Sequence, residues 1–477
     1  MAEADPRRWK ALAVVCAAFF MTVLDVSIVN VALPSIGKAL DFSRDNLQWV
    51  ITAYSISFGG FLLLAGRTAD LLGRRRVFLT GVVLFTAASF MCGLAWSEGV
   101  LIASRAVQGL GAAIISPAAL SIITTTFDEG AERNKALGIW GAIGGSGAAV
   151  GVLAGGVLTK YLGWEWIFFV NVPVGALVLV LAPRLVRESR ELREGTHDVP
   201  GALTVTAGLA LLVYAVSNAP AHGWSSGWTI SRIAIAAALL VAFLVIEARS
   251  KDPMLPFRIF RIRTVAGANV AGLLLGAVVF ANFFLLTLYV QQVLGWSALK
   301  TGITFIATAG TAVLWAGLAQ ALVTRVGPKT VMAAGFVAMI AGMVWYTQIP
   351  VHGSYWSDLL PGYLLVGFAL PFCFIPVSIA ALAGVESHEA GLASGLINTA
   401  QQIGGAVGVA VTSSVSLSHF NTLLRAHGPQ SFPQSFTAGS QWAFWVCVGI
   451  AAVGLVASLL LVRRDELAQV EEAAALA

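Results

Sequence analysis

Residues 9–34 read WKALAVVCAAFFMTVLDVSIVNVALP, an apolar run long enough for a helix that crosses a lipid bilayer, which needs about 20 residues. A single acid, Asp25, interrupts this run. A carboxylate inside the hydrocarbon costs roughly 2.5–3.5 kcal/mol on insertion scales, so acids found there usually serve a function. Asp25 is the only acid that we place within the hydrocarbon, and it is therefore our first candidate functional residue.

The composition extends this interpretation to the whole chain. Of the 477 residues, 58% are hydrophobic and 11% are charged, whereas an average soluble protein is about 25% charged. So few charges cannot cover the surface of a soluble protein of this size, and we predict an all-α polytopic membrane protein. The net charge of +5 predicts no nucleic-acid partner, because the basic residues follow one side of the membrane. The first run is longer than a signal-peptide core and lacks a small-residue cleavage site, so we expect it to persist as a helix.

Fourteen mostly apolar stretches of about 20 residues follow one another along the chain. If the N-terminus is cytoplasmic, the inside segments hold 22 of the 29 Lys and Arg, and the outside segments hold six. The positive-inside rule then predicts a multi-pass protein of the plasma (inner) membrane with both termini in the cytoplasm. The remaining basic residue, Arg105, falls within the hydrocarbon. The expected spans are 11–33, 47–65, 77–96, 100–125, 135–158, 165–182, 201–218, 230–248, 266–291, 301–324, 330–349, 357–383, 392–415 and 441–462.

The two ends of the chain resemble each other. GAAVGV at 147–152 matches GGAVGV at 404–409, and LLGRRRVFLTG at 71–81 faces RVGPKTVMAAG at 325–335, at offsets of 257 and 254. Matches in order at nearly one offset indicate duplicated six-helix bundles with an inserted two-helix hairpin. Parallel six-span halves of this kind place a substrate site near the midplane between them. The predicted domains are an N-terminal bundle at 1–183, linkers with the hairpin at 184–265, and a C-terminal bundle with a cytoplasmic tail at 266–477.

The short link between the second and third spans reads GRTADLLGRRR, residues 66–76. Its glycines permit tight turns and close helix approach, and Asp70 can accept hydrogen bonds from Arg or from a helix N-terminus. The basic residues alone would fit a cluster that only sets topology. The full pattern resembles the signature loop of the major facilitator superfamily, which implies a cytoplasmic latch that holds in the outward-open state. The residues that this resemblance assigns to the latch are Gly66, Asp70, Gly73, Arg74 and Arg75.

Further stretches resemble the fourteen-span drug:proton antiporter branch (EmrB/QacA type) of that superfamily. LDVSIVNVALP at 24–34 is similar to its span-1 motif, and SRAVQGLGAA at 104–113 to its span-4 motif with an intramembrane Arg. GSGAAVGVLAGG at 145–156 resembles the span-5 antiporter motif, and GWEWIFFVNVPVG at 163–175 also resembles the branch. The resemblance covers nearly the whole chain and implies export in exchange for protons. Its antiporter-motif helix would use Gly147, Gly151, Gly155 and Gly156, although Val152 stands where the motif usually has Pro.

Asp25 and Arg105 are expected in the same half of the bilayer. At 1.5 Å per residue, Asp25 lies roughly 13 Å and Arg105 roughly 8 Å below the outer surface, so they can meet. One hypothesis is a permanent ion pair without a transport role. A second is proton coupling, because burial favours the neutral acid while a nearby Arg favours the carboxylate. A third is that Asp25 holds a cationic substrate directly.

Polar and aromatic residues of the predicted spans are candidates for a substrate cavity, although such residues also pack helices together in membranes. Few charges and many aromatics suit an amphipathic organic molecule with at most a single positive charge better than a phosphate or dicarboxylate. The candidates, beside Asp25, are Trp140, Asn282, Tyr289, Asn398, Gln401 and Gln402.

The leading hypothesis is a secondary transporter that exports drug-like or antibiotic molecules in exchange for protons by alternating access. The chain has no Walker-type phosphate loop, so we do not expect ATP hydrolysis to drive it. Its histidines are scattered and its four cysteines lack ligand spacing, so we expect no enzyme, no metal and no cofactor. The alternative is a proton-coupled symporter or an exporter of an endogenous metabolite. The expected partners are a small-molecule substrate, protons and the lipid bilayer, and the expected state is a monomer.

Overall fold

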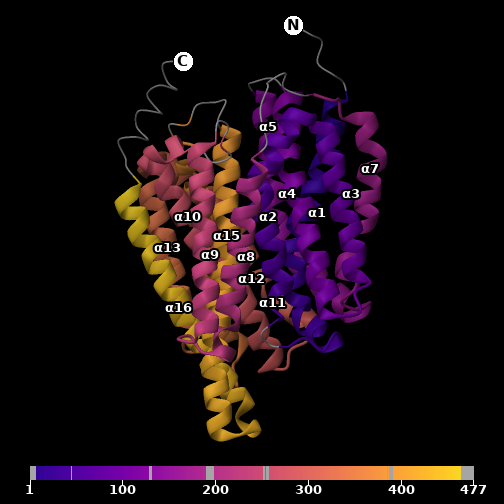
Figure 1. The fold of residues 1–477 in the computed structure, drawn as a ribbon. Helices are drawn as coiled ribbons and strands as arrows, with labels where there is room; N and C mark the ends of the chain where they lie inside the picture. Colours follow the sequence, from indigo (N-terminus) through magenta and orange to yellow (C-terminus); the bar gives the residue numbers. More distant parts are fainter. Residues whose placement is uncertain are drawn as a thin grey trace. The chain divides into compact units, whose positions relative to one another are not determined.

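The computed structural model describes the chain except for residues 1–6, 44–45, 128–130, 190–197, 251–252, 254–256, 384, 386–389 and 463–477. Some side chains within residues 61–71, 131–149 and 390–392 also lie outside the description. Every described element is a helix, which confirms the all-α class (Figure 1).

Two compact units divide the chain. Unit 1 comprises Met1–Thr206 and Phe243–Met254, and unit 2 comprises Ala207–Ala242 and Leu255–Ala477, so α8 (Val199–His222) and α9 (Gly227–Arg249) belong partly to each. The other helices of unit 1 are α1 (Arg8–Ala39), α2 (Trp49–Leu72), α3 (Arg74–Gly93), α4 (Glu98–Thr126), α5 (Ala131–Tyr161), α6 (Trp166–Phe169) and α7 (Asn171–Leu185). Those of unit 2 are η1 (Phe257–Arg261), α10 (Arg263–Gln292), α11 (Ala298–Thr304), α12 (Ile306–Val326), α13 (Pro328–Tyr346), η2 (Tyr355–Leu359), α14 (Leu360–Ala381), α15 (Ala390–His427), η4 (Pro429–Ser431) and α16 (Phe432–Leu461).

The described residues contain 12 helices that are long and apolar enough to span a membrane, which confirms the polytopic class. Helices α2 and α5 are 24 and 31 residues long, and each contains side chains outside the description. The count of fourteen spans therefore stays a prediction, with α2 and α5 as the two further spans.

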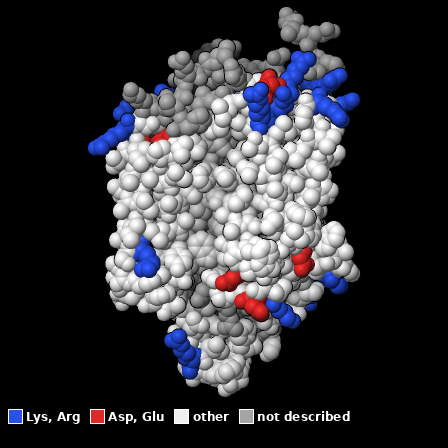
Figure 2. All heavy atoms as spheres, turned by 45° about the vertical axis from the view of Figure 1, so that its right-hand side comes forward, with Lys and Arg blue, Asp and Glu red and all other residues white. Residues whose placement is uncertain are grey.

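The surface of the helices fits a lipid environment. On the face shown in Figure 2, the charged side chains of the described residues lie towards the two ends of the helices, and the described residues between them are uncharged. Large apolar side chains are exposed along the helices, and aromatic residues stand at one end of unit 1. Trp96 is 71% exposed, Tyr161 66% and Trp166 46%. Trp and Tyr favour the boundary between hydrocarbon and water, so these residues mark one membrane surface of unit 1.

Two predicted spans are interrupted. The span expected at 165–182 consists of α6 and α7 with a break at Val170, and the span expected at 301–324 breaks at Phe305 between α11 and α12. Pro173 explains the first break, because proline has no N–H to donate to the carbonyl of Phe169 one turn earlier. Each of these two stretches is still long and apolar enough to span a membrane, so both predicted spans are confirmed, each as two helices joined at the break.

Glycines allow close packing of a helix pair in each unit, α1 with α5 and α10 with α15. In unit 1, a Cβ at Gly151 of α5 would lie 2.9 Å from the carbonyl oxygen of Leu24 in α1. In unit 2, a Cβ at Gly408 of α15 would collide with the carbonyl oxygen of Ala277 in α10. Gly151 and Gly408 are the residues that the 257-residue offset pairs. The repeat noticed in the sequence therefore corresponds to the same kind of close helix contact.

The stretch 416–440, which connects the spans expected at 392–415 and 441–462, is almost entirely helical. Helix α15 continues to His427, the chain turns at Gly428 with φ +80°, and α16 begins at Phe432. Figure 1 shows the two helices continuing together past their neighbours in unit 2. The rings of Phe420, Phe432 and Phe436 pack against one another and hold the two helices together. Since α15 has 38 residues, about 57 Å of helix, part of it must lie outside a hydrocarbon core of about 30 Å.

Candidate functional site

The structure brings Asp25 of α1 and Arg105 of α4 into direct contact. Arg105 Nη1 donates to Asp25 Oδ2 at 2.5 Å, and the two side chains are 0% and 1% exposed. The contact that the depth estimate allowed is therefore present, and the two intramembrane charges compensate each other. A buried pair of this kind is stable only when further hydrogen bonds satisfy both groups.

Three neutral side chains complete the surroundings of the carboxylate. Gln108 Nε2 donates to Asp25 Oδ1 at 2.8 Å, and Asn171 Nδ2 donates to the same oxygen at 3.2 Å. Both amides also donate to Ser89 Oγ, at 3.1 and 3.0 Å. Helices α1, α4 and α7 therefore meet at the carboxylate, and α3 joins them through Ser89. We call Asp25, Arg105, Gln108, Asn171 and Ser89 the polar cluster.

The guanidinium of Arg105 has further partners. Its Nε donates to the carbonyl oxygen of Val50 in α2 at 2.8 Å, and Nη1 also donates to Gln108 Oε1 at 2.6 Å. The ring of Tyr54 lies 4.4 Å from the guanidinium carbon, in the geometry of a cation–π contact. Arg105 is thus held by α1, α2 and its own helix. A rigid-body movement of any of these helices would change what Asp25 faces.

Gln108 and Asn171 were not among the residues that we selected from the sequence. Gln108 follows Arg105 by three positions, which places both on one face of a helix, so the spacing could have indicated it. Asn171 is a lone polar residue in the run WIFFVNVPVG, and it reaches Asp25 because α7 begins there. Ser89 carries no signal in the sequence, since serine is common in packed membrane helices.

At the other end of unit 1, the link between α2 and α3 turns at Gly73, whose φ of +108° suits glycine. The Glu188 carboxylate, which follows α7, accepts from the backbone N–H groups of Arg75 at 3.0 Å and Arg76 at 3.2 Å. It therefore caps the first turn of α3, where a negative charge is favourable. Glu188 is a further residue that the sequence analysis missed.

The other residues that the sequence predicts for a latch are placed as follows. Gly66 lies within α2, where a Cβ would touch the Pro117 ring of α4 at 3.4 Å. Arg74 is buried, and its N–H donates to the carbonyl oxygen of Ser189. Arg75 Nη1 donates to the carbonyl oxygens of Pro183 and Val186, at 3.3 and 3.2 Å. The Asp70 side chain lies outside the described residues.

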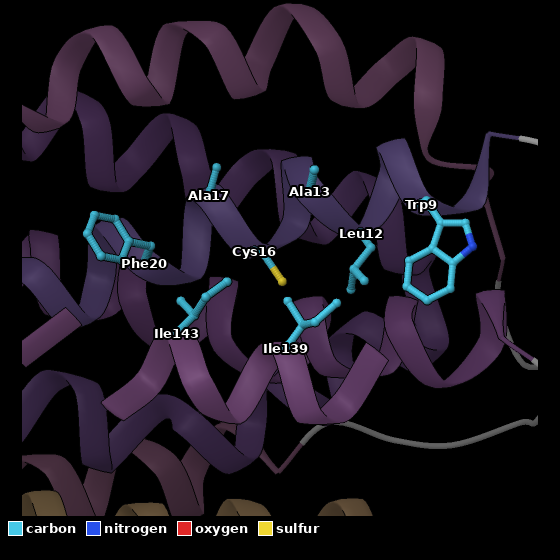
Figure 3. Close-up of a pocket in the computed structure, with 8 residues that line it drawn as sticks. All are labelled: Trp9, Leu12, Ala13, Cys16, Ala17, Phe20, Ile139 and Ile143. Carbon is cyan, nitrogen blue, oxygen red and sulfur yellow. The ribbon is translucent and has the colours of Figure 1, made fainter. Parts of the chain in front are cut away.

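Helices α1 and α5 touch closely in one half and separate in the other. The antiporter-motif glycines Gly147, Gly151 and Gly155 face α1 around Asp25, and Gly156 is buried. Towards the start of α1 the two helices line an open apolar cavity of about 490 Å³. Figure 3 shows Leu12 and Cys16 of α1 pointing towards Ile139 and Ile143 of α5, while Ala13 and Ala17 point away from α5. Its lining residues are Trp9, Leu12, Ala13, Cys16, Ala17, Phe20, Ile139 and Ile143.

The residues predicted to bind substrate are distributed over both units. In unit 1, Trp140 is half-buried and stacks on Phe19, with ring centroids 3.6 Å apart. In unit 2, Tyr289 donates its hydroxyl to the carbonyl oxygen of Pro350, and exposed Asn398 donates to Ser394 of its own helix at 2.9 Å. Asn282 is 1% exposed, and Gln401 and Gln402 are half-buried. The Oδ1 of Asn282 and the Oε1 of Gln402 accept no hydrogen bond from any described residue.

Comparisons with known proteins give a consistent result. The sequence profile of the Major Facilitator Superfamily matches residues 15–409. The puromycin resistance protein pur8 of Streptomyces alboniger is 40% identical over 460 residues, which cover 96% of this chain and 91% of that protein. The cephamycin export protein CmcT of Amycolatopsis lactamdurans is 40% identical over 411 residues, with 85% and 84% covered. The structure is also similar to that of a bacterial homologue of the human lysosomal transporter Spinster in an inward-facing, unoccupied conformation, with a TM-score of 0.70 at 15% identity, covering 98% and 99% of the chains. At that identity the likeness shows the fold alone.

Proposed function

The chain belongs to the major facilitator superfamily, and on that premise we propose that it exports amphipathic, drug-like or antibiotic molecules in exchange for protons. Two relatives at 40% identity carry names that refer to antibiotic resistance and antibiotic export. The family and these relatives are transporters and not enzymes, so the chain moves a small molecule across a membrane without changing it covalently.

The buried pair of Asp25 and Arg105 carries the proposal of proton coupling. With Arg105 in place, the carboxylate has a cation and two amide donors, which favour the charged form. If a movement of α1 against α4 withdraws Arg105, burial favours the neutral acid, and Asp25 takes up a proton. If the proton affinity of Asp25 changes each time the site opens to the other side of the membrane, the transporter exchanges a substrate molecule for a proton. A permanent ion pair without transport work is the hypothesis that this proposal replaces.

For the membrane topology we propose fourteen spans, with α2 and α5 added to the 12 helices already counted. Both termini would be cytoplasmic in the plasma membrane, since 22 of the 29 basic residues then face inward. Residues 1–183 and 266–477 would form the two six-helix bundles, with α8 and α9 as the inserted hairpin in 184–265. We propose that the protein works as a monomer.

The proposed cytoplasmic latch is Gly66, Asp70, Gly73, Arg74 and Arg75. Gly73 provides the turn, and the contacts of Arg75 with the end of α7 hold the first turn of α3. Glu188 would belong to the same latch, because it caps that turn. Breaking these contacts would free the link during the change of access.

For the substrate, we propose that the apolar cavity between α1 and α5 takes the hydrophobic part of the molecule (Figure 3). The stacked Trp140 lies on α5 close to its lining and offers a π-surface. Asp25 would attract a positive charge further along α1. From unit 2 we propose Asn282, Tyr289, Asn398, Gln401 and Gln402, of which Asn282 and Gln402 have free acceptor oxygens among the described residues.

A resistance assay tests the proposal. Cells without their own drug pumps express the wild type, Asp25→Asn, or the control Glu165→Gln, whose acid lies outside the polar cluster. We expect the wild type and the control to raise the lethal concentration of at least one compound in a panel that includes puromycin and a cephamycin. Protonophore and Asp25→Asn should each abolish this protection. Wild-type protection by Asp25→Asn would refute proton coupling through Asp25, and accumulation of a compound instead of its loss would favour symport.

A further inference from the structure

The hydrogen bonds around Asp25 all point the same way. Arg105, Gln108 and Asn171 each donate to the carboxylate, and none of them presents an acceptor to it. A carboxylate satisfies this arrangement, whereas a protonated acid has an O–H that needs an acceptor. Leaving a buried O–H without a partner is unfavourable. If Asp25 takes up a proton, one neighbour must therefore change from donor to acceptor.

Arg105 and Gln108 cannot make that change in place. A guanidinium has five N–H donors and no acceptor. Gln108 does have an acceptor, but its Oε1 already accepts from Arg105 Nη1 at 2.6 Å and from Cys92 Sγ at 3.6 Å. Turning the Gln108 amide over would set its NH₂ against the guanidinium, where two donors would oppose each other. The orientation of Gln108 is thus fixed by Arg105.

Asn171 is free to turn over. Its Nδ2 donates to Asp25 and Ser89, while its Oδ1 is buried and accepts no hydrogen bond from the described residues. The oxygen and the NH₂ of an amide have nearly the same size, so a half-turn of the amide exchanges them without needing space. The NH₂ then gives up its bonds to Asp25 and Ser89 and moves to the place where Oδ1 has no described partner, a cost that the new bond to the protonated acid has to offset. Afterwards Oδ1 would face Asp25 and could accept from its O–H. Ser89 suits either orientation, because a hydroxyl can donate or accept.

The other titratable groups near the cluster do not offer the missing acceptor. Tyr54 of α2 lies against Arg105 through its ring, and Cys92 of α3 donates to Gln108. The described residues of α5 that face α1 around Asp25 are glycines, and α6 contributes the ring of Phe168 and its carbonyl, which accepts from Ser89. Among these groups, Asn171 is the one that has both a contact with Asp25 and an unused acceptor.

We propose that Asn171 is a positioning residue that reports the protonation state of Asp25: its amide donates to the carboxylate and turns over to accept from the protonated acid. The proposal rests on the proposed function, in which Asp25 takes up a proton. The proton is added at Oδ1, the oxygen that Asn171 contacts, and no other bond changes. Asn171 is the first residue of α7, directly after the break at Val170. A turn of its amide also lets Ser89 redirect its hydroxyl from the Phe168 carbonyl, so the state of Asp25 reaches the backbone of α6.

Infrared difference spectroscopy of the full-length protein in lipid vesicles tests the proposal. Acidification should produce a carboxylic-acid C=O band that is absent in Asp25→Asn, which assigns it to Asp25. In Asn171→Leu, a similar volume without polar atoms, this band should move to higher wavenumber because the O–H loses its acceptor. Asn171→Ser keeps a group that can donate or accept and should leave the band near its wild-type position.

A matched control is available in Asn30→Leu. Asn30 lies on α1 and, like Asn171, has a buried amide whose Oδ1 accepts no hydrogen bond from described residues. Its Nδ2 donates to the carbonyl oxygen of Val26 and not to Asp25. This variant should leave the Asp25 band unchanged. If Asn171→Leu does not reach the membrane, the pair Asn171→Ala and Asn171→Ser carries the same comparison.

The pH profile of transport separates a turning amide from a fixed donor. A fixed donor stabilises only the carboxylate, so its loss in Asn171→Leu would move the midpoint up by about one pH unit, a tenfold change in proton affinity. A turning amide stabilises both forms, so the midpoint should move by much less while the maximal rate falls and KM stays unchanged. A shift of a full unit, or an unmoved infrared band, would overturn the proposal for Asn171. A wild-type protein with no Asp25 band at any pH at which it transports would instead overturn proton uptake by Asp25 itself.

Discussion

Replacing Arg105 by methionine tests the energetic role of the buried pair. Methionine keeps much of the apolar stem and removes the guanidinium, together with its hydrogen bonds to Asp25, Gln108 and the Val50 carbonyl. Asp25, at 0% exposure, then has two amide donors but no counter-charge. Breaking a buried ion pair by removing one partner costs about 3–5 kcal/mol, because the other charge stays uncompensated.

The cost should depend on pH with a definite sign. At high pH the Asp25 carboxylate of the Arg105→Met variant is buried without a cation, so the loss of stability relative to the wild type is largest. As the pH falls, a proton neutralises Asp25 and the loss shrinks. The double variant Asp25→Asn with Arg105→Met removes both charges and keeps an amide oxygen for Gln108, so it should regain about half or more of the loss at high pH.

Thermal unfolding of the purified variants, followed by the fluorescence of the 14 tryptophans, measures both effects. Melting temperatures at several pH values give the sign, and the double variant gives the coupling between the two residues. A loss that is the same at every pH, or two single losses that simply add in the double variant, would refute the account of a coupled buried pair.

Three further predictions concern helix contacts and the cavity. Gly151→Ala should lower the transport rate at least severalfold, because its Cβ would lie 2.9 Å from the Leu24 carbonyl oxygen. The control Gly449→Ala, with open space around it, should transport normally, and equal rates for the two variants would contradict the close α1–α5 contact. Glu188→Ala should destabilise the protein by about 1 kcal/mol through the lost cap of α3, measured as a lower melting temperature, and an unchanged value would argue against the cap. Ile139→Trp should fill part of the cavity and raise KM most for the bulkiest substrates. A uniform effect on all substrates would place the cavity outside their path.

The helix pattern was largely predictable because a membrane helix needs only an apolar run of sufficient length. The approach of Asp25 to Arg105 followed from the same arithmetic of rise per residue, since both helices cross the same layer. Gln108 could have been added by helical spacing. Asn171 could not, because its position depends on where α7 begins after the break at Val170, which tertiary packing sets together with Pro173.

The helical structure of segment 416–440 was not predicted from the sequence. A count of apolar residues ended the spans at the membrane surface and left this stretch as a loop, since it contains Arg425, His427 and several polar residues. In the structure both helices continue, and the rings of Phe420, Phe432 and Phe436 pack together across the turn at Gly428. Such pairing joins residues on two helices and is not visible in a one-dimensional measure of apolar character.

Proton flux through the purified protein tests the central claim most directly. The wild type, Asp25→Asn and the control Glu165→Gln are each placed in lipid vesicles that contain a pH-sensitive dye, and a substrate identified by the resistance assay is added. We predict that substrate movement drives an opposite proton flux in the wild type and in Glu165→Gln, and that Asp25→Asn shows no such flux. A substrate-driven proton flux in Asp25→Asn equal to that of the wild type would contradict the claim that Asp25 carries the proton.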